Sequence, residues 1–319
     1  MPLDTPLPAQ APLISVVTPC FNEAGNVREM YEAIKDVFAG LPQYRYEHIF
    51  IDNASKDSTV SILRSIATDD RNVKVIVNAR NFGHVRSGYH AILQARGDAV
   101  IAIACDFQDP PELIPDFLRR WSEGARVVLG IKESSDESGV FYRLRDSYYR
   151  LLARIADIEL VRQSTGFGCF DQSVIEALRH IDDPYPYFRG LLAEIGHEPS
   201  LVPFRQPERK RGLSSQNFYT LYDLAFLGIV NHSKVPLRMA TMAGFGLALL
   251  SLLVAFGYLG YKLLFWNQFS VGIAPILIGF FFLTSVQLFF IGIVGEYIGS
   301  IYTQVRHHPH VFEKERINY

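Results

Sequence analysis

The first 110 residues carry four clusters of carboxylate and amide side chains. In chain order they are Asn22–Glu23, Asp52–Asn53, Asn78–Asn81 and Asp106–Asp109. Each cluster follows a short run of β-branched and other apolar residues, of the kind that forms a buried strand. Carboxylate and amide groups can hydrogen-bond the ring N–H groups of a base and the hydroxyls of a ribose. A carboxylate such as Asp106 can also hold a divalent cation between two phosphates, because Mg²⁺ and Mn²⁺ favour oxygen ligands.

Strands and helices alternate along the stretch that positions these clusters. Apolar runs predict strands at Ile14–Thr18, His48–Ile51, Val73–Val77, Ala99–Ala104 and Val127–Gly130. Apolar residues at helical spacing predict helices at Asn22–Phe38, Ser58–Ala67 and Val85–Ala95. This alternation predicts an α/β fold with a mostly parallel sheet and helices on its faces. Ligands of such sheets bind beyond the carboxyl ends of the strands, so we expect the four clusters to converge on one site.

Some polar residues near the clusters have a structural explanation. We expect Asp57 and Ser58 to cap the N-terminus of the second helix. We expect Asp109 to be a turn or cap residue, because Pro110 and Pro111 fix the turn that precedes the next helix.

Two long apolar runs near the C-terminus, Met239–Tyr261 and Val271–Gly295, contain no Asp, Glu, Lys or Arg. They have 23 and 25 residues, and about 20 apolar residues suffice to cross a bilayer as a helix. We expect two transmembrane helices within residues 236–303; a buried hairpin of a soluble protein is the alternative. Lys234, Arg238 and Arg306 flank the outer ends of the pair. By the positive-inside rule, the N-terminal domain and both termini are expected in the cytoplasm.

Charge and cysteine content limit the kinds of partner and the cysteine chemistry to be expected. The 31 basic residues nearly balance the 33 acidic ones, which argues against nucleic acid as the main partner. Cys20, Cys105 and Cys169 lack the spacing of a zinc site or a redox pair, so we expect them to be reduced and buried. Residues 1–13 are rich in proline and lack the basic and apolar regions of a signal peptide, which predicts a disordered lead-in.

Four stretches of this sequence resemble the successive motifs of family 2 glycosyltransferases. They are Ser15–Glu23 (SVVTPCFNE), Asp52–Asp57 (DNASKD), Ala79–His84 (ARNFGH) and Asp106–Glu112 (DFQDPPE). The two apolar runs, followed by Gly295–Tyr302 (GEYIGSIY), resemble the branch that makes polyprenyl-phosphate sugars, the dolichol-phosphate mannose synthase-like and undecaprenyl-phosphate-loading enzymes. The resemblance covers nearly the whole chain. It implies a GT-A fold over residues 14–212, a nucleotide-sugar donor, a divalent cation (Mg²⁺ or Mn²⁺) and a lipid-phosphate acceptor.

The resemblance also implies roles for individual residues. The nucleobase and ribose pocket would be lined by Pro19, Phe21, Asn22, Glu23 and Asp52. The loop beside the donor would contain Asn81 and Gly83. Asp106 would be the metal-binding carboxylate, with Gln108 as a second contact to the metal or to phosphate.

Two positions depart from the family pattern. The metal-binding strand usually ends in Asp-x-Asp, but this chain has Ala104-Cys105-Asp106 and lacks the first carboxylate. Further along, Gly166 and Gly168 stand where the family often has the aspartate and arginine of a Gly-Asp-Phe-Arg-like segment. A phosphate acceptor is already anionic near neutral pH. We therefore predict little need of a catalytic base and a strong dependence on positioning.

Basic and amphipathic segments are available for the acceptor. Arg209 and Arg211 precede the apolar runs, and we assign them to the catalytic site because guanidinium groups suit phosphate oxygens. Further arginines on a helix predicted at Val140–Val161 either bind phosphate or face solvent or lipid headgroups. Residues 213–235 are expected to form an interfacial amphipathic helix, with packing against the soluble domain as the alternative. Residues 304–319 are expected to be a cytoplasmic tail.

These features predict an integral membrane glycosyltransferase of the bacterial inner membrane. It would transfer a sugar from a nucleotide-sugar donor to undecaprenyl or dolichyl phosphate on the cytoplasmic face. A processive polysaccharide synthase, the first alternative, would need a Gln-x-x-Arg-Trp element, which neither Trp121 nor Trp266 supplies. A catalytically silent homologue that binds nucleotide-sugar or lipid is the second, because of Ala104 and Gly166. Small residues in the apolar runs also permit close helix contacts and a homo-oligomer.

Overall fold

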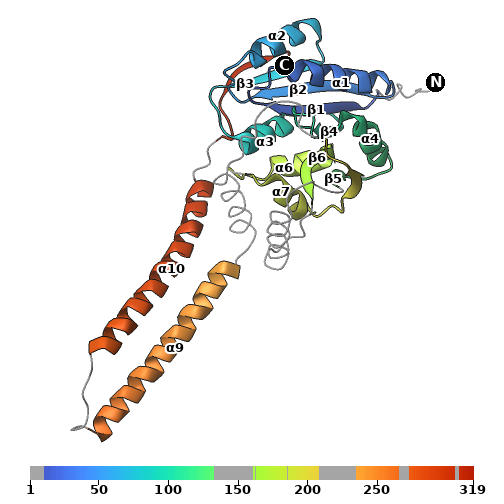
Figure 1. Cartoon of the computed structure of the whole chain (residues 1–319). Helices are drawn as coiled ribbons and strands as arrows, with labels where there is room; N and C mark the ends of the chain where they lie inside the picture. Colours follow the sequence, from blue (N-terminus) through green and yellow to red (C-terminus); the bar gives the residue numbers. More distant parts are fainter. Residues whose placement is uncertain are drawn as a thin grey trace, which may run out of the picture.

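The computed structural model describes residues 11–132, 161, 163–184, 186–207, 235–265, 273–305 and 309–319. The strands are β1 (Leu13–Cys20), β2 (Arg45–Asp52), β3 (Val73–Asn78), β4 (Ala99–Ala102), β5 (Val127–Lys132), β6 (Ser164–Asp171), β7 (Ser200–Phe204) and β8 (Glu313–Ile317). The helices are α1 (Val27–Ala39), α2 (Thr59–Asp69), α3 (His84–Gln94), the 3₁₀ turn η1 (Pro111–Leu113), α4 (Ile114–Ser122), α6 (Gln172–Arg179), α7 (Phe188–Ile195), α9 (Val235–Leu264) and α10 (Ile273–Val305). Figure 1 shows the sheet with its helices, and the long helices α9 and α10 extending away from it.

The strands form one sheet in the order β7-β5-β6-β4-β1-β2-β3-β8. The central strands β4, β1, β2 and β3 are parallel, and β5 and β7 run in the same direction. β6 is antiparallel to β4 and β5, and β8 is antiparallel to β3. The predicted α/β fold with a mostly parallel sheet is therefore confirmed. Strands β1 to β5 and β7 all end at one edge of the sheet, here called the carboxyl edge.

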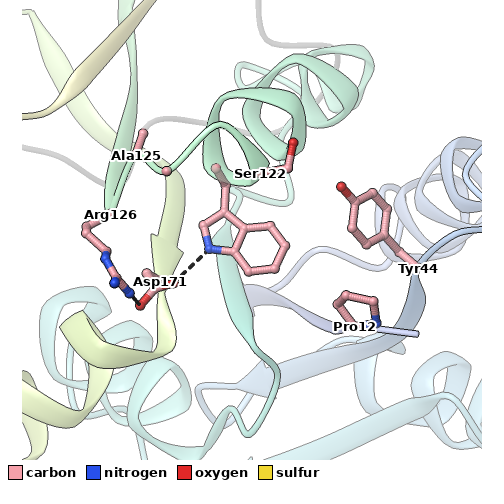
Figure 2. Close-up of a pocket in the computed structure, with 8 residues that line it drawn as sticks. Pro12, Tyr44, Ser122, Ala125, Arg126 and Asp171 are labelled. Atoms are coloured by element: carbon pink, nitrogen blue, oxygen red, sulfur yellow. Dashed lines mark hydrogen bonds and ion pairs between the residues drawn. The ribbon is translucent and has the colours of Figure 1, made fainter. Parts of the chain in front are cut away.

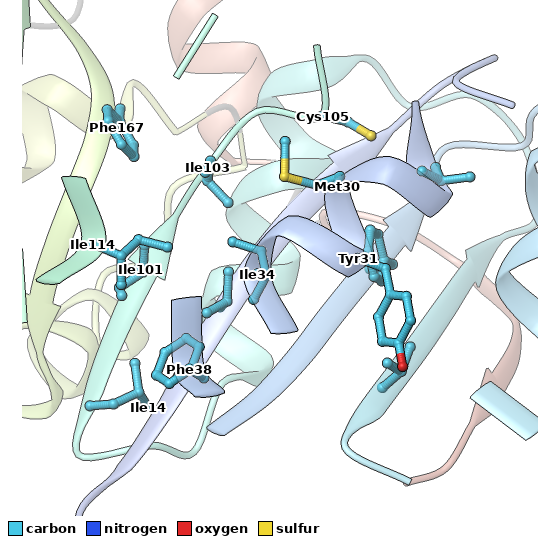
Figure 3. Packing of buried hydrophobic residues seen from close by; sticks show 14 of the residues in the cluster. Ile14, Met30, Tyr31, Ile34, Phe38, Ile101, Ile103, Cys105, Ile114 and Phe167 are labelled. Carbon is cyan, nitrogen blue, oxygen red and sulfur yellow. The ribbon is translucent and has the colours of Figure 1, made fainter. Parts of the chain in front are cut away.

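Successive residues of the central strands point to opposite faces of the sheet. Ile14 and Val16 of β1 belong to the core that α1, α2 and α4 cover, whereas Val17 belongs to the core beneath α3, α6 and α7. Figure 3 shows the first core, where Met30 and Ile34 of α1 lie among side chains from the sheet. Because helices cover both faces, the central strands are nearly continuous apolar runs, which is why their positions can be predicted.

Three strands are present that the sequence analysis does not predict: β6, β7 (SLVPF) and β8. β6 contains two glycines, Gly166 and Gly168, which interrupt any alternation of apolar residues. β8 has the sequence EKERI, whose charged residues suit an edge strand but carry no apolar period. β8 lies within the expected tail 304–319, so part of that segment belongs to the sheet.

The two long helices carry the apolar runs. α9 has 30 residues and α10 has 33, and Phe245, Phe280 and Phe289 are among the many apolar side chains that are more than half exposed. In the part of the chain that the structure describes, one helical stretch, Gly279–Gly299, is long and apolar enough to cross a membrane. Leu237–Leu250 is a shorter apolar stretch. One span is thus supported by length and composition, and the second stays a prediction.

Several predicted features lie outside the described residues. They are the lead-in up to residue 10, the predicted helix from Val140 to residue 160, the interfacial segment 213–234, and both Arg209 and Arg211.

Replacement of Gly168 by alanine tests the packing of β5 against β6. A Cβ at this position would lie 2.1 Å from the carbonyl oxygen of Val128, so the two strands would have to move apart. We expect Gly168→Ala to lower the free energy of unfolding by about 3 kcal/mol, measured as a lower Tm. Gly88→Ala is the control, because its Cβ would meet Pro19 Cγ at 3.7 Å, an ordinary contact. Equal Tm values for Gly168→Ala and the wild type would contradict the described pairing.

Candidate active site

The loops after β1 and β2 are joined at the carboxyl edge by hydrogen bonds. The Asn22 N–H donates to Ser55 Oγ (2.8 Å), and Asn22 Oδ1 accepts from the Lys56 N–H (2.9 Å). The Glu23 N–H donates to Thr59 Oγ1 (2.9 Å). Asn22 has a φ of +57°, a left-handed conformation that asparagine tolerates better than most residues. The first predicted cluster is therefore fixed against the start of α2.

Of the two residues expected to cap α2, Asp57 makes the capping hydrogen bond and Ser58 does not. Asp57 Oδ1 accepts from the Thr59 N–H (3.0 Å), and Asp57 Oδ2 accepts from the Ala24 N–H (3.1 Å). Ser58 occupies the N-cap position, but its side chain makes no capping hydrogen bond. Asp57 thus connects α2 with the loop after β1.

Asp52 ends β2 and is fully buried. Its Oδ2 accepts from the Ser55 N–H (2.9 Å), whereas its Oδ1 is buried without a hydrogen-bond partner. Burial raises the pKa of this carboxyl above its ordinary value. An unpaired buried oxygen is costly, and an N–H group of a ligand would satisfy it. Recognition of a base by Asp52 stays a prediction, for which the unpaired oxygen supplies a physical reason.

A network of asparagine amides joins the ends of β2 and β3. Asn53 Nδ2 donates to Asn81 Oδ1 (2.9 Å), and Asn78 Nδ2 donates to Asn53 Oδ1 (3.1 Å). Asn53 Oδ1 also accepts from the Phe82 N–H (2.9 Å), and Asn81 Oδ1 accepts from the Gly83 N–H (2.8 Å). Gly83 has a φ of +86°, a conformation that favours glycine. These bonds set the shape of residues 78–84, which we call the donor loop.

The loop after β4 presents Asp106 at the same edge. Asp106 Oδ1 accepts from the Gln108 N–H (3.2 Å). Asp109 Oδ2 accepts from the Ala104 N–H (3.1 Å), so Asp109 ties the two ends of this loop, in keeping with its expected turn role. Burial raises the pKa of Asp109 to about 6, and the neighbouring Asp106 acts in the same direction.

Asp106 and Gln108 are the side chains of this loop that we assigned to a metal. Among the described residues, no group of three or more His, Cys, Asp or Glu is placed to hold a metal ion. Mg²⁺ sites are commonly built from one or two carboxylates, with water and substrate phosphates as the other ligands. Asp106 supplies one carboxylate and Gln108 one amide to such a site, and their binding of a cation stays a prediction.

Two further polar residues at this edge, Lys132 and Thr165, are absent from the sequence assignments. Lys132 is the last residue of β5, and its charge lowers the pKa of Asp109. The side chain of Thr165, in β6, also lowers the pKa of Asp109. A charged residue directly after an apolar strand is the signal that could have identified Lys132, but the predicted strand ended at Gly130.

The backbone at Gly166 suits glycine. Its φ is +94°, and a Cβ there would lie 3.5 Å from Phe188 Cδ1. An aspartate at this position would be strained by the left-handed conformation rather than by lack of space. The missing carboxylate is therefore linked to the local conformation of β6.

The structure places all the assigned residues that it describes at the carboxyl edge. They are Pro19, Phe21, Asn22, Glu23, Asp52, Asn81, Gly83, Asp106 and Gln108. Their roles in binding and catalysis stay predictions. Cys20, Cys105 and Cys169 are free and buried, as expected.

A hollow of about 420 Å³ lies at the opposite edge of the sheet (Figure 2). In its wall, Trp121 Nε1 donates to Asp171 Oδ2 (2.9 Å), and Arg126 forms an ion pair with Asp171 (2.6 Å). Asp171 also caps α6 by accepting from the Ser173 N–H. These groups satisfy one another and stabilise the fold, and the length of the strands separates them from the candidate site.

Comparison with known proteins identifies the family. The family model described as Glycosyl transferase family 2 matches residues 15–179. The chain is 33% identical over 297 residues to the bactoprenol glucosyl transferase of Shigella phage SfV, covering 93% of this chain and 96% of that protein. It is 31% identical over 297 residues to an uncharacterized glycosyltransferase of Synechocystis, covering 93% of each. The chain therefore belongs to glycosyl transferase family 2 and is a glycosyltransferase, as the resemblance implied.

Two solved structures are also similar to this chain. Glucosyl-3-phosphoglycerate synthase from Mycobacterium tuberculosis, in complex with Mn²⁺, uridine diphosphate and phosphoglyceric acid, has a TM-score of 0.48 and 19% identity, over 69% of this chain and 76% of that one. S. aureus TarS 1–349 in complex with UDP-GlcNAc has a TM-score of 0.44 and 18% identity, over 69% of this chain and 67% of that one. The observed sheet and the family membership together bear out the predicted GT-A-type α/β fold.

Asp109→Asn tests the burial of the carboxyl that ties the Asp106 loop. The pKa of Asp109 rises from 3.8 to about 6 on folding, so the folded protein binds a proton more tightly than the unfolded chain. This carboxyl therefore makes the free energy of unfolding fall as the pH rises from about 4 to about 6. The asparagine keeps an acceptor for the Ala104 N–H but cannot ionise. We expect the Tm of the variant, relative to the wild type, to rise between pH 4 and pH 7. A constant Tm difference over this range would contradict the assignment.

Proposed function

We propose that this glycosyltransferase moves a sugar from a nucleotide-sugar donor to a polyprenyl phosphate at the cytoplasmic face of a membrane that α9 and α10 both span. The observation that carries the proposal is where the chain leaves the sheet. β7 ends at Phe204 and β8 begins at Glu313, and both points lie at the carboxyl edge. The chain runs from the first point toward α9 and reaches the second after α10. The candidate site and the connections to the apolar helices thus share one edge.

The exposed helices support a membrane acceptor. Their large apolar side chains, such as Phe245 and Phe289, are 75% and 65% exposed, a surface that water disfavours and acyl chains accept. The relatives include bactoprenol glucosyl transferases, whose name states the transfer of glucose and a polyprenol. A polyprenyl phosphate held in the same bilayer would present its phosphate at the membrane surface, and the carboxyl edge would face that surface.

The donor would bind across the ends of β1, β2 and β3. The unpaired Oδ1 of Asp52 would accept an N–H group of the base. Phe21, 38% exposed, would contribute an apolar surface beside it. The donor loop, shaped by Asn53 and Asn81, would lie against the sugar or diphosphate part.

The reaction would proceed by attack of an acceptor phosphate oxygen on the anomeric carbon of the donor sugar. A new bond forms from that carbon to the lipid phosphate, and the bond to the nucleoside diphosphate breaks. The acceptor oxygen is already anionic, so the site must orient it rather than deprotonate it. The guanidinium groups of Arg209 and Arg211 would hold the acceptor phosphate.

A divalent cation, when bound, would neutralise charge that grows on the leaving diphosphate. Asp106 and Gln108 are the residues that would hold it. Lys132, at the end of β5, would add a fixed positive charge at the same edge.

The reaction class can be tested by mass spectrometry of lipid products. Purified full-length protein would be incubated with undecaprenyl or dolichyl phosphate and a panel of UDP-, GDP- and dTDP-sugars, with Mg²⁺ or Mn²⁺ and separately with EDTA. We expect a lipid-phosphate sugar from one donor in the presence of a cation and much less with EDTA. Absence of product with every donor would contradict the proposal.

Asp106→Asn tests the assigned metal ligand. The amide keeps the shape of the side chain but removes its charge, so we expect turnover to fall by about 100-fold or more. Asp116→Asn is the control, because Asp116 is an exposed carboxylate of α4 that pairs with Arg119 (3.4 Å). Near-normal turnover of Asp106→Asn with a cation present would remove Asp106 as a ligand.

A catalytically silent homologue is the second candidate, and Ala104 favours it because the first carboxylate of the metal motif is missing. Such a protein would bind UDP, GDP or dTDP in calorimetry and yet form no lipid-linked sugar. Product formation in the lipid assay excludes it.

A further inference from the structure

The C-terminal segment, residues 309–319, returns from α10 to the sheet. β8 pairs with β3 so that Glu313 lies opposite Asn78 and Ile317 lies opposite Val75. Just before β8, the carbonyl oxygen of Phe312 accepts from the Ala79 N–H (2.8 Å). In Figure 1 this red strand runs beside β3. The segment therefore extends the sheet past the end of β3, onto the start of the donor loop.

The same segment also contacts the helix that follows the donor loop. His90 Nε2 of α3 lies 2.6 Å from Glu313 Oε1, and Arg316 donates to Gln94 Oε1 (2.9 Å). The ring of His310 packs edge-on against Tyr89, with 5.1 Å between the ring centroids. The C-terminal segment therefore contacts both elements that flank the donor loop in the chain, β3 before it and α3 after it.

Phe312 touches the middle of the donor loop. Its ring centroid lies 6.2 Å from that of Phe82, which is 9% exposed. The Phe82 N–H donates to Asn53 Oδ1, the oxygen that Asn78 Nδ2 also contacts. The guanidinium of Arg80 covers the Phe82 ring at 4.0 Å. A shift of Phe82 would therefore disturb the amide network that shapes the loop.

The far end of the segment is anchored independently of the donor loop. Glu315 pairs with Arg64 of α2 (2.5 Å). Asn318 Nδ2 donates to the carbonyl oxygens of Ala67 (2.6 Å) and Val73 (2.8 Å). Because these contacts lie away from residues 78–84, they separate the stability of β8 from its effect on the loop.

We propose that the C-terminal segment is a positioning element of the donor site, and that Phe312 is the residue through which it holds the donor loop. The inference rests on the proposed role of this loop in binding a nucleotide-sugar. Pro309 follows the last residue of α10, Val305, by four positions, so the segment also connects the loop to the membrane helix. A purely structural role, covering the edge of β3, would affect stability without favouring one substrate.

Phe312→Ala separates these roles. Full-length wild type and variant would be assayed with the active nucleotide-sugar and with undecaprenyl phosphate, each varied in turn. We expect the KM for the donor to rise about 3- to 10-fold, because an aromatic contact that orders the loop is lost, while the KM for the lipid stays unchanged. Phe312→Tyr keeps the ring and should restore the donor KM. Glu315→Gln is the matched control, because it weakens β8 at its far anchor and should leave both KM values unchanged.

Binding and exchange measurements test the inference without turnover. In the variant, amide hydrogen exchange should become faster in residues 78–84, and the Kd for the nucleoside diphosphate that wild type binds, found by calorimetry with UDP, GDP and dTDP, should rise. An inactive wild type would defeat the proposed function, and these two measurements would still decide the role of Phe312. Unchanged donor KM, Kd and exchange in Phe312→Ala would overturn the inference. Equal rises in both KM values together with a lower Tm would also overturn it, since that pattern indicates a structural role.

Discussion

The parallel pairing of β1 with β2 and β4 is the constraint on which the candidate site depends. Its register sets Cys20 opposite Asp52, so β1 and β2 end level, and it sets Ala102, the last residue of β4, opposite Val17. Side chains alternate along a strand, so a slip of one residue would move Asp52 to the other face of the sheet. It would also exchange the apolar side chains of the strand between the two cores. The two apolar cores oppose such a slip from both faces. The loops can therefore be polar and irregular while the ends that carry them stay fixed.

Much of this arrangement could be predicted from the sequence, for a definite physical reason. Strands buried on both faces leave apolar runs, and the polar residues that end them are conspicuous, as Asp52 is after Ile51. The convergence of the clusters follows from strand direction alone. Lys132 is not predicted as a site residue, because β5 continues through Ile131 beyond the predicted strand end at Gly130. β8 is not predicted, because an edge strand with the sequence EKERI shows no apolar alternation.

The departures from the family pattern concern the side of the site next to β4 and β6. Ala104 contributes a backbone N–H, which Asp109 accepts, where the family often has a carboxylate. Gly166 contributes a left-handed turn where the family often has an aspartate. At both positions this chain has a backbone feature where the family has a carboxylate side chain. On the β1–β3 side, by contrast, the assigned side chains Asn22, Asp52 and Asn81 are intact and held by hydrogen bonds. The positions assigned to the donor therefore match the family pattern more completely than the positions next to β4 and β6.

The position of β8 has a consequence for how the protein is made. Arg64 and Glu315, which pair across this edge, are 251 residues apart in the sequence. During synthesis the chain emerges from its N-terminus, so β3 remains an open edge until both apolar helices have been translated. Such distant pairing is slow to form, and an open strand edge can join to other chains. The sheet is therefore completed last, after α9 and α10 have been translated, and chains truncated within α10 would carry every assigned donor residue on a sheet whose edge is still unpaired.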